Sequence, residues 1–213
     1  MVIGALKRVP VVSRRRLSVV LSARVIGSDQ SAGELARAQE QAGTGARLLL
    51  RASGSALPIA DECADAVVVS MALMLLCPLD TVLAQIRRLL RPGGTVVATL
   101  PMRAASPGPE GTPAFARILA ALGQSTNSYP ERVDDATLAD RFCGTGLTLG
   151  ADETKLFART VADPEDAEQI IRSFYAPGVG PDRVTAAVAE LEDQVRSAPV
   201  TITYRIRRLV ARR

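Results

Sequence analysis

Five small or polar residues follow apolar stretches of the sequence, at positions where a ligand could be bound. Asp29 ends the stretch VIGSD and precedes Gln30, whereas Ser70 ends the stretch AVVVS. Ser53 and Gly54 stand shortly after a run of three leucines. A carboxylate can accept two hydrogen bonds from a ribose diol, and tiny side chains let backbone amides approach a planar base. The pattern therefore indicates a nucleoside site, although each residue taken alone also fits an ordinary loop before a helix.

The apolar stretches alternate with helical patterns in the order that builds a parallel sheet covered by helices. We expect strands over residues 24–28, 48–50, 64–70 and 95–100. One helix is expected from Ser31, with Glu34 completing a capping box, to about residue 43. Another is expected over residues 79–90, where six apolar residues follow helical spacing before RPGG turns the chain. Because ligands bind beyond the carboxyl ends of the strands in such sheets, the candidate residues should gather at one edge.

The second half of the sequence continues with loops, helices and strands. Residues 101–113 are rich in proline and glycine, so we expect a loop or hinge there. Helices are expected from that loop to about residue 122, over residues 134–142, from Asp163 and Pro164 onwards, and over residues 181–195. Strands are expected over residues 155–161 and over residues 200–211, where apolar and polar residues alternate.

The composition excludes several kinds of site. The chain of 213 residues has no histidine, which removes every mechanism that needs an imidazole base or ligand. Its three cysteines, at positions 63, 77 and 143, form no C-x-x-C pair, so we expect neither a metal site nor a disulfide framework. No apolar run approaches the roughly 18 residues that span a bilayer. We therefore expect a cytoplasmic protein without a metal and without membrane contact.

Positive charge is concentrated at the start of the chain. Residues 1–24 contain six cations and no acid, whereas the rest of the chain contains 20 cations and 22 acids. A broad basic face is not predicted, so we expect no nucleic-acid partner. The segment SRRRLSVVLSA is similar to a twin-arginine export signal, but Arg24 ends its apolar stretch after seven residues, and export is not expected.

Three blocks of the sequence, VIGSDQS, SALPIADECADAVVVSMAL and QIRRLLRPGGTVVATLP, together resemble the class I S-adenosylmethionine-dependent methyltransferases, in particular the small-molecule type. Their order and spacing agree with that family over residues 24–101, and RRLLRPGG before a strand is the most specific block. The resemblance implies a doubly wound, mostly parallel α/β sheet with helices on both faces and an antiparallel C-terminal strand. This is the Rossmann-like methyltransferase fold, and S-adenosylmethionine is the implied methyl donor.

The resemblance also implies roles for the candidate residues. Asp29 would hold the ribose hydroxyls of the donor, and the adjacent Gln30 would belong to the same donor site. Ser53 stands where the family commonly carries an aspartate for the adenine amino group, and Gly54 would offer its backbone beside the ring. A serine hydroxyl is the weaker acceptor, contributing about 1 kcal/mol net. Apart from the resemblance, residues 70–73, which begin with Ser70 after the valine run, are a natural position for backbone contacts to the reactive end of a ligand.

The sequence departs from the family ahead of the first block. The family begins with a strand and an acidic, glycine-rich loop, about 20 residues before the ribose acid. Residues 9–16, VPVVSRRR, could hold that strand in residues 9–12 but contain no glycine and no acid, and their arginines would repel the cationic donor. Either the fold is N-terminally incomplete in this sequence, or the chain is a degenerate member. We predict a basic, atypical and poorly packed segment over residues 1–23, before a methyltransferase-like domain over residues 24–213.

The leading hypothesis is methyl transfer to a small-molecule acceptor. Lid segments are expected near residues 101–135 and 161–198, with Tyr129, Phe174 and Tyr175 as candidate substrate contacts. No single residue in the sequence can be assigned as a catalytic base. For methyl transfer the main requirement is the alignment of the donor with the acceptor. One alternative is a non-catalytic partner subunit that keeps the fold. Another is a nicotinamide-dependent dehydrogenase, which would need a G-x-G-x-x-G motif that is absent. A homodimer is a possible assembly.

Overall fold

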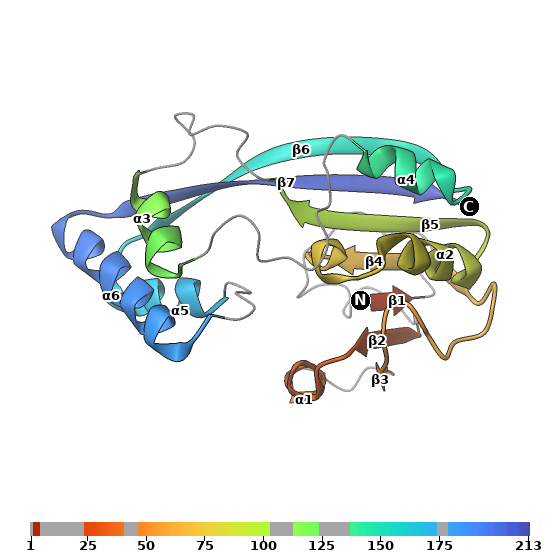
Figure 1. Ribbon diagram of the computed structural model, residues 1–213, viewed down its shortest axis with the longest axis horizontal. Helices are drawn as coiled ribbons and strands as arrows, with labels where there is room; N and C mark the ends of the chain where they lie inside the picture. The colour runs from red at the N-terminus through yellow and green to blue at the C-terminus, as the bar shows by residue number, and fades with distance from the viewer. Residues whose placement is uncertain (1, 5–23, 41–46, 103–112, 124–136, 174–178) are drawn as a thin grey trace. The chain divides into compact units, whose positions relative to one another are not determined.

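The computed structural model describes residues 2–4, 24–40, 47–102, 113–123, 137–173 and 179–213. The described strands form one sheet in the order β3-β2-β1-β4-β5-β7-β6, with helices beside it (Figure 1). The strands are β1 (Val2–Gly4), β2 (Val25–Asp29), β3 (Arg47–Arg51), β4 (Ala64–Ser70), β5 (Leu90–Pro101), β6 (Thr148–Val161) and β7 (Val200–Arg212). The helices are α1 (Ala32–Glu40), α2 (Leu79–Leu89), α3 (Pro113–Ala121), α4 (Leu138–Gly144), α5 (Pro164–Ser173) and α6 (Pro181–Ser197), with one 3₁₀ turn at Leu73–Leu75.

The sheet is mixed, and β1 and β7 run against the other strands. β2 pairs parallel with β3 and β4 pairs parallel with β5, whereas β1 is antiparallel to both of its neighbours. The amide of Gly93 bonds to the carbonyl of Arg213, and the amide of Met102 bonds to that of Arg205, each at 2.9 Å. Residue numbers rise from 93 to 102 on the β5 side while they fall from 213 to 205 on the β7 side, so these strands are antiparallel. The arrows in Figure 1 show the same directions. The expected antiparallel C-terminal strand is confirmed.

The centre of the first half follows the sequence prediction closely. β4 has the predicted bounds, and its side chains alternate between buried and half-buried positions. All six apolar positions predicted for α2 and its end are buried: Leu79, Val82, Leu83, Ile86, Leu89 and Leu90. They join Val67 and Val69 of β4 and the buried aliphatic residues of β5 in one hydrophobic cluster. Removal of this apolar surface from water, at about 25 cal/mol per Å², is the main stabilisation of this part.

The first strand differs from the prediction. β1 consists of Val2–Gly4 and pairs through its backbone with β2 and β4 in the middle of the sheet order. Poor packing of the rest of the N-terminal segment stays a prediction. Residues 9–12, the predicted first strand, lie outside the described residues. Gly4 pairs with Val25, the first residue of β2. The chain therefore leaves β1 and enters β2 at the same edge of the sheet, which is the edge opposite Asp29.

The RPGG segment forms a bulge inside β5 instead of a turn ahead of it. Ala64 of β4 pairs with Leu90, and Ala66 pairs with Thr95, so residues 91–94 loop out between two paired positions. The bulge contacts the last residue of the chain, because the amide of Arg213 bonds to the carbonyl of Gly94 at 3.1 Å. The strand consequently begins at Leu90, five residues before the predicted start.

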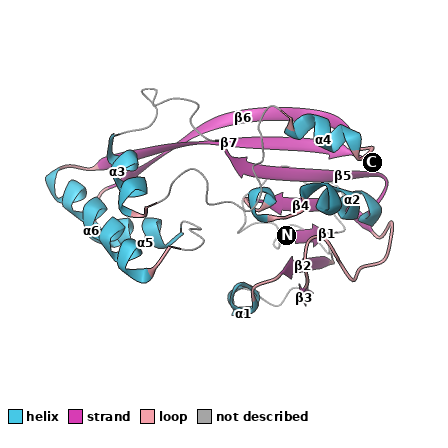
Figure 2. Cartoon of the chain, in the orientation of Figure 1, coloured by secondary structure: helices cyan, strands magenta, loops and turns pink. Residues whose placement is uncertain are grey.

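The chain divides into two compact units. One contains Met1–Leu100, Val133–Glu153 and Arg208–Arg213, and the other contains Pro101–Arg132 and Thr154–Arg207. In the second unit α3, α5 and α6 lie side by side around their own hydrophobic cluster (Figure 2). In β7 the even-numbered Ile202 is buried near the start of the strand, whereas the odd-numbered Leu209 and Ala211 are buried near its end. None of the described helices is long and apolar enough to cross a membrane.

Candidate functional site

A network of short hydrogen bonds fixes the turn that follows β2. The amide of Ser31 donates to Oδ1 of Asp29 at 2.8 Å, and the hydroxyl of Ser31 accepts from the amide of Glu34 at 3.3 Å. The second bond is one half of the predicted capping box of α1. The other half is not formed, because the amide of Ser31 donates to Asp29 and the carboxylate of Glu34 accepts from Arg37. The amide of Ala52 bonds to the carbonyl of Asp29 at 3.1 Å, which joins the end of β3 to the same turn. No described residue bonds to Oδ2 of the half-buried Asp29, so this oxygen can accept from a ligand.

Asp29 and Ser70 lie at the same level of the sheet although β1 separates their strands. Val2 pairs with Gly27 on one side and with Val68 on the other. Asp29 stands two residues after Gly27, at the carboxyl end of β2. Ser70 stands two residues after Val68, at the carboxyl end of β4. With about 4.8 Å between neighbouring strands, their Cα atoms are about 10 Å apart. The prediction that these two residues share one edge of the sheet is therefore confirmed by the register.

Ser53 and Gly54 form a tight turn after β3. The hydroxyls of Ser53 and Ser55 are 2.8 Å apart, and the amide of Ser55 donates to the Ser53 hydroxyl at 3.3 Å. Gly54 is buried, and a Cβ atom added there would lie 3.1 Å from Cδ2 of Leu76. Gly54 thus has a packing reason for its small size that is independent of any ligand. The hydroxyl of Ser53 keeps one lone pair for a further hydrogen bond when it donates to Ser55, and keeps its hydrogen when it accepts from Ser55.

The backbone after Ser70 has an unusual conformation. Met71 has a φ of 53°, in the left-handed region that residues other than glycine rarely adopt. Its amide bonds to the carbonyl of Thr99 at 2.8 Å, and the Thr99 hydroxyl lies 3.4 Å from the Ser70 hydroxyl. Strained backbone of this kind is often kept at functional sites. Met71 lies in the stretch 70–73 that the sequence marked for backbone contacts. Thr99 was not among the predicted site residues, and only its position near the end of β5 could have indicated it.

Arg51 is a further residue that sequence reasoning missed. It pairs with Asp29 across the parallel ladder, and its Nε donates to the carbonyl of Gln30 at 3.1 Å. Gln30 itself is exposed. The predicted contribution of the Gln30 side chain to the donor site stays a prediction, whereas its backbone serves to hold Arg51. No pattern in the sequence distinguishes Arg51 from an ordinary charged residue at the end of a strand.

Arg88 holds the chain that runs from the Ser53 turn to β4. Its guanidinium donates to the carbonyls of Leu57 and Ile59, at 3.0 and 2.7 Å, and forms an ion pair with Asp61. We expect Arg88→Ala to lower the free energy of unfolding by about 2 kcal/mol, because two carbonyls lose charge-assisted bonds at a partly exposed site. Denaturant unfolding measures this, with the exposed Arg87→Ala as the control. Equal stability of the two variants would contradict the role of Arg88.

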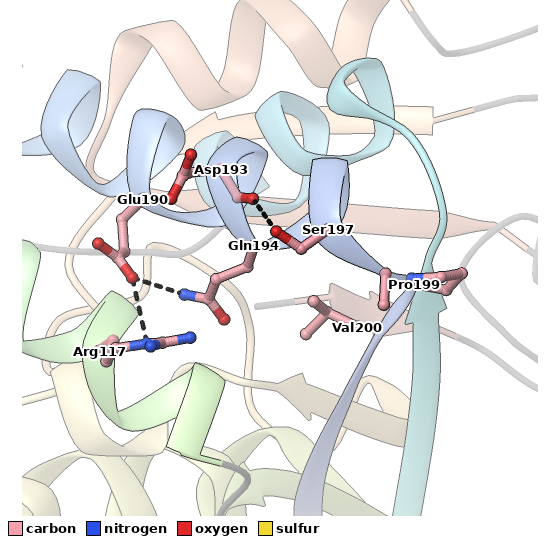
Figure 3. Close-up of a pocket in the computed structure, with 8 residues that line it drawn as sticks. Arg117, Glu190, Asp193, Gln194, Ser197, Pro199 and Val200 are labelled. Atoms are coloured by element: carbon pink, nitrogen blue, oxygen red, sulfur yellow. Dashed lines mark hydrogen bonds and ion pairs between the residues drawn. The ribbon is translucent and has the colours of Figure 1, made fainter.

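The hollow shown in Figure 3 lies in the second unit, between α3, α6 and the start of β7, with a volume of about 350 Å³. Nε of Arg117 and Nε2 of Gln194 both approach Oε1 of Glu190, at 3.2 and 2.8 Å. Oε1 of Gln194 is buried without a described partner. None of the predicted donor-site residues lines this hollow, so it is not the site that the sequence predicts. Tyr129, Phe174 and Tyr175 lie outside the described residues.

The described residues fit one end of the implied donor better than the other. Asp29, Ser53 and Ser70 supply acceptors at the carboxyl edge, where a nucleoside binds in sheets of this kind. The amino end of β1 lies at this edge, and its carboxyl end lies at the opposite one. No loop that follows β1 begins beside Asp29, so the described residues provide no glycine-rich turn for the methionine end.

This arrangement of strands and helices is the Rossmann-like α/β fold of methyltransferases. The family model described as a methyltransferase domain matches residues 12–98, less than half of the chain. No curated protein matches the sequence.

Several solved structures are similar to the chain. The (4+2)-cyclase SpnF is 19% identical with a TM-score of 0.56, and the match covers 93% of this chain and 68% of that one. The YcgJ protein of Bacillus subtilis is 14% identical with a TM-score of 0.55, covering 88% and 81%. An S-adenosylmethionine-dependent methyltransferase of Mesorhizobium loti is 19% identical with a TM-score of 0.50, covering 88% and 79%.

Likeness at this level of identity establishes the fold alone. The domain match over residues 12–98 and the methyltransferases among the similar structures are likenesses to such enzymes. They do not identify a methyl acceptor. The cyclase among the similar structures also shows that function has to be argued from the site.

Proposed function

We propose that this protein binds S-adenosylmethionine at the carboxyl edge of β2, β3 and β4 and transfers its methyl group to a small-molecule acceptor. The observation that carries the proposal is the position of Asp29. Asp29 lies at the end of β2, level with Ser70, and its backbone carbonyl accepts from the amide of Ala52 in the chain that leads to Ser53. A ribose diol needs an acceptor at this place, and Oδ2 of Asp29 supplies one.

The chain's own contribution is to position the donor and the acceptor. The sulfonium of S-adenosylmethionine supplies an already activated methyl group, so alignment and exclusion of water account for most of the catalysis. Asp29 holds the ribose, Ser53 accepts from the adenine amino group, and the strained backbone at Met71, just after β4, is assigned to the reactive end of the donor. We assign no catalytic base among the described residues.

Transfer of an isotope-labelled methyl group tests the proposal. The protein is incubated with methyl-labelled S-adenosylmethionine and a cell extract separated into small-molecule, protein and nucleic-acid fractions. We expect the label in the small-molecule fraction, with S-adenosylhomocysteine formed in equal amount. Label in protein or nucleic acid would contradict the acceptor class. No label in any fraction, with no binding of the donor, would favour the second candidate function.

The second candidate is a non-catalytic partner subunit, and the direction of β1 favours it. In this structure the strand between β2 and β4 is antiparallel to both, so its carboxyl end lies at the edge opposite Asp29. A protein of this kind would keep the hydrophobic cluster of α2, β4 and β5 and bind no donor. It would raise the activity of a catalytic subunit when mixed with it.

Ser53→Asp is expected to strengthen donor binding about fivefold. An ionised carboxylate accepts a stronger hydrogen bond than a hydroxyl, by about 1 kcal/mol. An aspartate can still accept the bond from the amide of Ser55 that the Ser53 hydroxyl accepts now. Isothermal titration with S-adenosylhomocysteine measures the change, and Ser55→Asp in the same turn is the control. Weaker binding by Ser53→Asp than by Ser55→Asp would contradict the adenine contact.

A further inference from the structure

The middle of β6 is exposed on both of its faces. Residues 152–160 are exposed without interruption, which is unusual because an edge strand normally buries every second side chain. Among the described residues, β6 ends the sheet order and has β7 as its neighbour. Four large hydrophobic side chains are exposed in the described part of the chain, and Leu156, Phe157 and Tyr204 are three of them. Exposed apolar groups gathered on one edge indicate a contact surface.

The register places these side chains along one two-stranded ribbon. Thr160 lies across from Thr201, and Glu153 lies across from Arg208, so the two strands are antiparallel. The same register sets Phe157 opposite Tyr204, whose rings stack with centroids 5.8 Å apart. Met102, the residue after β5, donates its amide to the carbonyl of Arg205 in β7, and the residues after Met102 lie outside the described part of the chain. Beyond this point the described ribbon has two strands, and a ribbon of two strands is marginally stable in water by itself.

We infer that β6 pairs antiparallel with β6 of a second copy of this chain, about a two-fold axis at Leu156. In that register Leu156 faces its own copy on one face of the joined sheet. On the other face Glu153 of each copy lies opposite Arg159 of the other copy. Lys155 of each copy likewise lies opposite Phe157 of the other copy. Every charged side chain from 153 to 159 thereby faces an opposite charge or an aromatic ring.

The charges concerned are accessible for such pairing. Glu153 binds Arg208 at 2.7 Å, but about half of its side chain, 49%, stays exposed. Arg159 binds Asp166 at 3.1 Å and stays 51% exposed. Lysine at the centre of an edge strand commonly prevents pairing. The two-fold register removes that obstacle, because it sets the lysine beside the Phe157 ring. A symmetric pair of this kind needs one self-complementary surface only.

Leu156→Lys and Leu48→Lys make a matched pair of tests. Both leucines lie in strands at the ends of the sheet order, and both are 54% exposed. In sedimentation velocity we expect the unaltered chain at twice its mass of 22.5 kDa, Leu156→Lys at that mass, and Leu48→Lys still paired. An unaltered chain that stays monomeric at all concentrations would overturn the inference. Dissociation by Leu48→Lys but not by Leu156→Lys would overturn it as well.

A charge exchange tests the register itself. Glu153→Arg alone places two arginines opposite each other, and Arg159→Glu alone places two glutamates opposite each other, so each variant is expected to be monomeric. Mixed together, the two variants restore both opposite-charge pairs and should form a heterodimer, which different tags detect. The exchange does not restore the internal pairs with Arg208 and Asp166, so recovery reports the contact between copies. A mixture that stays monomeric would overturn the register.

Discussion

Asp29→Ala is expected to weaken the binding of S-adenosylmethionine at least tenfold, or about 1.4 kcal/mol. The substitution removes Oδ2, which no described residue uses and which the proposed function assigns to the ribose. It also removes Oδ1, which accepts the amide of Ser31 at 2.8 Å. Part of the loss could therefore come from a looser turn, and isothermal titration of the alanine variant alone does not separate the two effects.

Asp29→Asn separates the ligand contact from the turn. Asparagine still accepts the amide of Ser31 and so keeps the turn, but its neutral oxygen is a weaker acceptor and it has no second one. We expect an unchanged melting temperature and a donor affinity between those of the unaltered chain and Asp29→Ala. If Asp29→Asn and Asp29→Ala both bind the donor as tightly as the unaltered chain, Asp29 does not hold the ribose.

Gly94→Ala is expected to lower the free energy of unfolding by about 3 kcal/mol. A Cβ atom at this position would lie 2.9 Å from the carbonyl oxygen of Arg91 and 3.2 Å from that of Ala64. Both are backbone atoms, so the bulge itself would have to move, and overpacking of this kind costs about 1–3 kcal/mol or more. In a chain of this size the melting temperature should fall by about 6–12 °C.

The matched control is Gly144→Ala at the end of α4. A Cβ atom added there would meet no atom within 4 Å. Alanine also favours the helical conformation over glycine, so no loss of stability is expected. Differential scanning calorimetry of the two variants gives the comparison. Equal melting temperatures for Gly94→Ala and Gly144→Ala would mean that the bulge adapts freely and that RPGG does not need its second glycine.

The local elements could be predicted because local signals determine them. The valine run of β4 and the spacing of apolar residues in α2 gave the right bounds within a residue or so. Asp163 was predicted to begin a helix, and its carboxylate accepts the amide of Asp166 at 2.8 Å in front of α5. These features depend on residues that are close in sequence, where capping and periodicity act.

Pairings between distant residues could not be predicted. Nothing in Val2–Gly4 shows that these residues run antiparallel between β2 and β4. The bulge at RPGG depends on Arg213, which is more than a hundred residues away in sequence. The simple alternation predicted for the last strand also fails, because the residues of β7 that are buried change from even to odd positions.

The candidate site was predictable to about the same extent. Asp29 and Ser70 could be placed at one edge of the sheet because both end strands with clear hydrophobic patterns. The strain at Met71 and the contact of Arg51 with Gln30 depend on backbone geometry that no residue type signals. Gly54 fits the resemblance, but its packing against Leu76 shows that a glycine in a loop can have a purely structural cause.

Equilibrium binding of S-adenosylhomocysteine to the unaltered chain, with adenosine and methionine as competitors, tests the central claim most directly. The proposed contacts of Asp29 and Ser53 are to the nucleoside end, so we predict saturable binding of one ligand per chain that adenosine displaces and methionine does not. A chain that takes up neither S-adenosylhomocysteine nor adenosine at saturating concentrations would contradict a nucleoside site at the Asp29 edge.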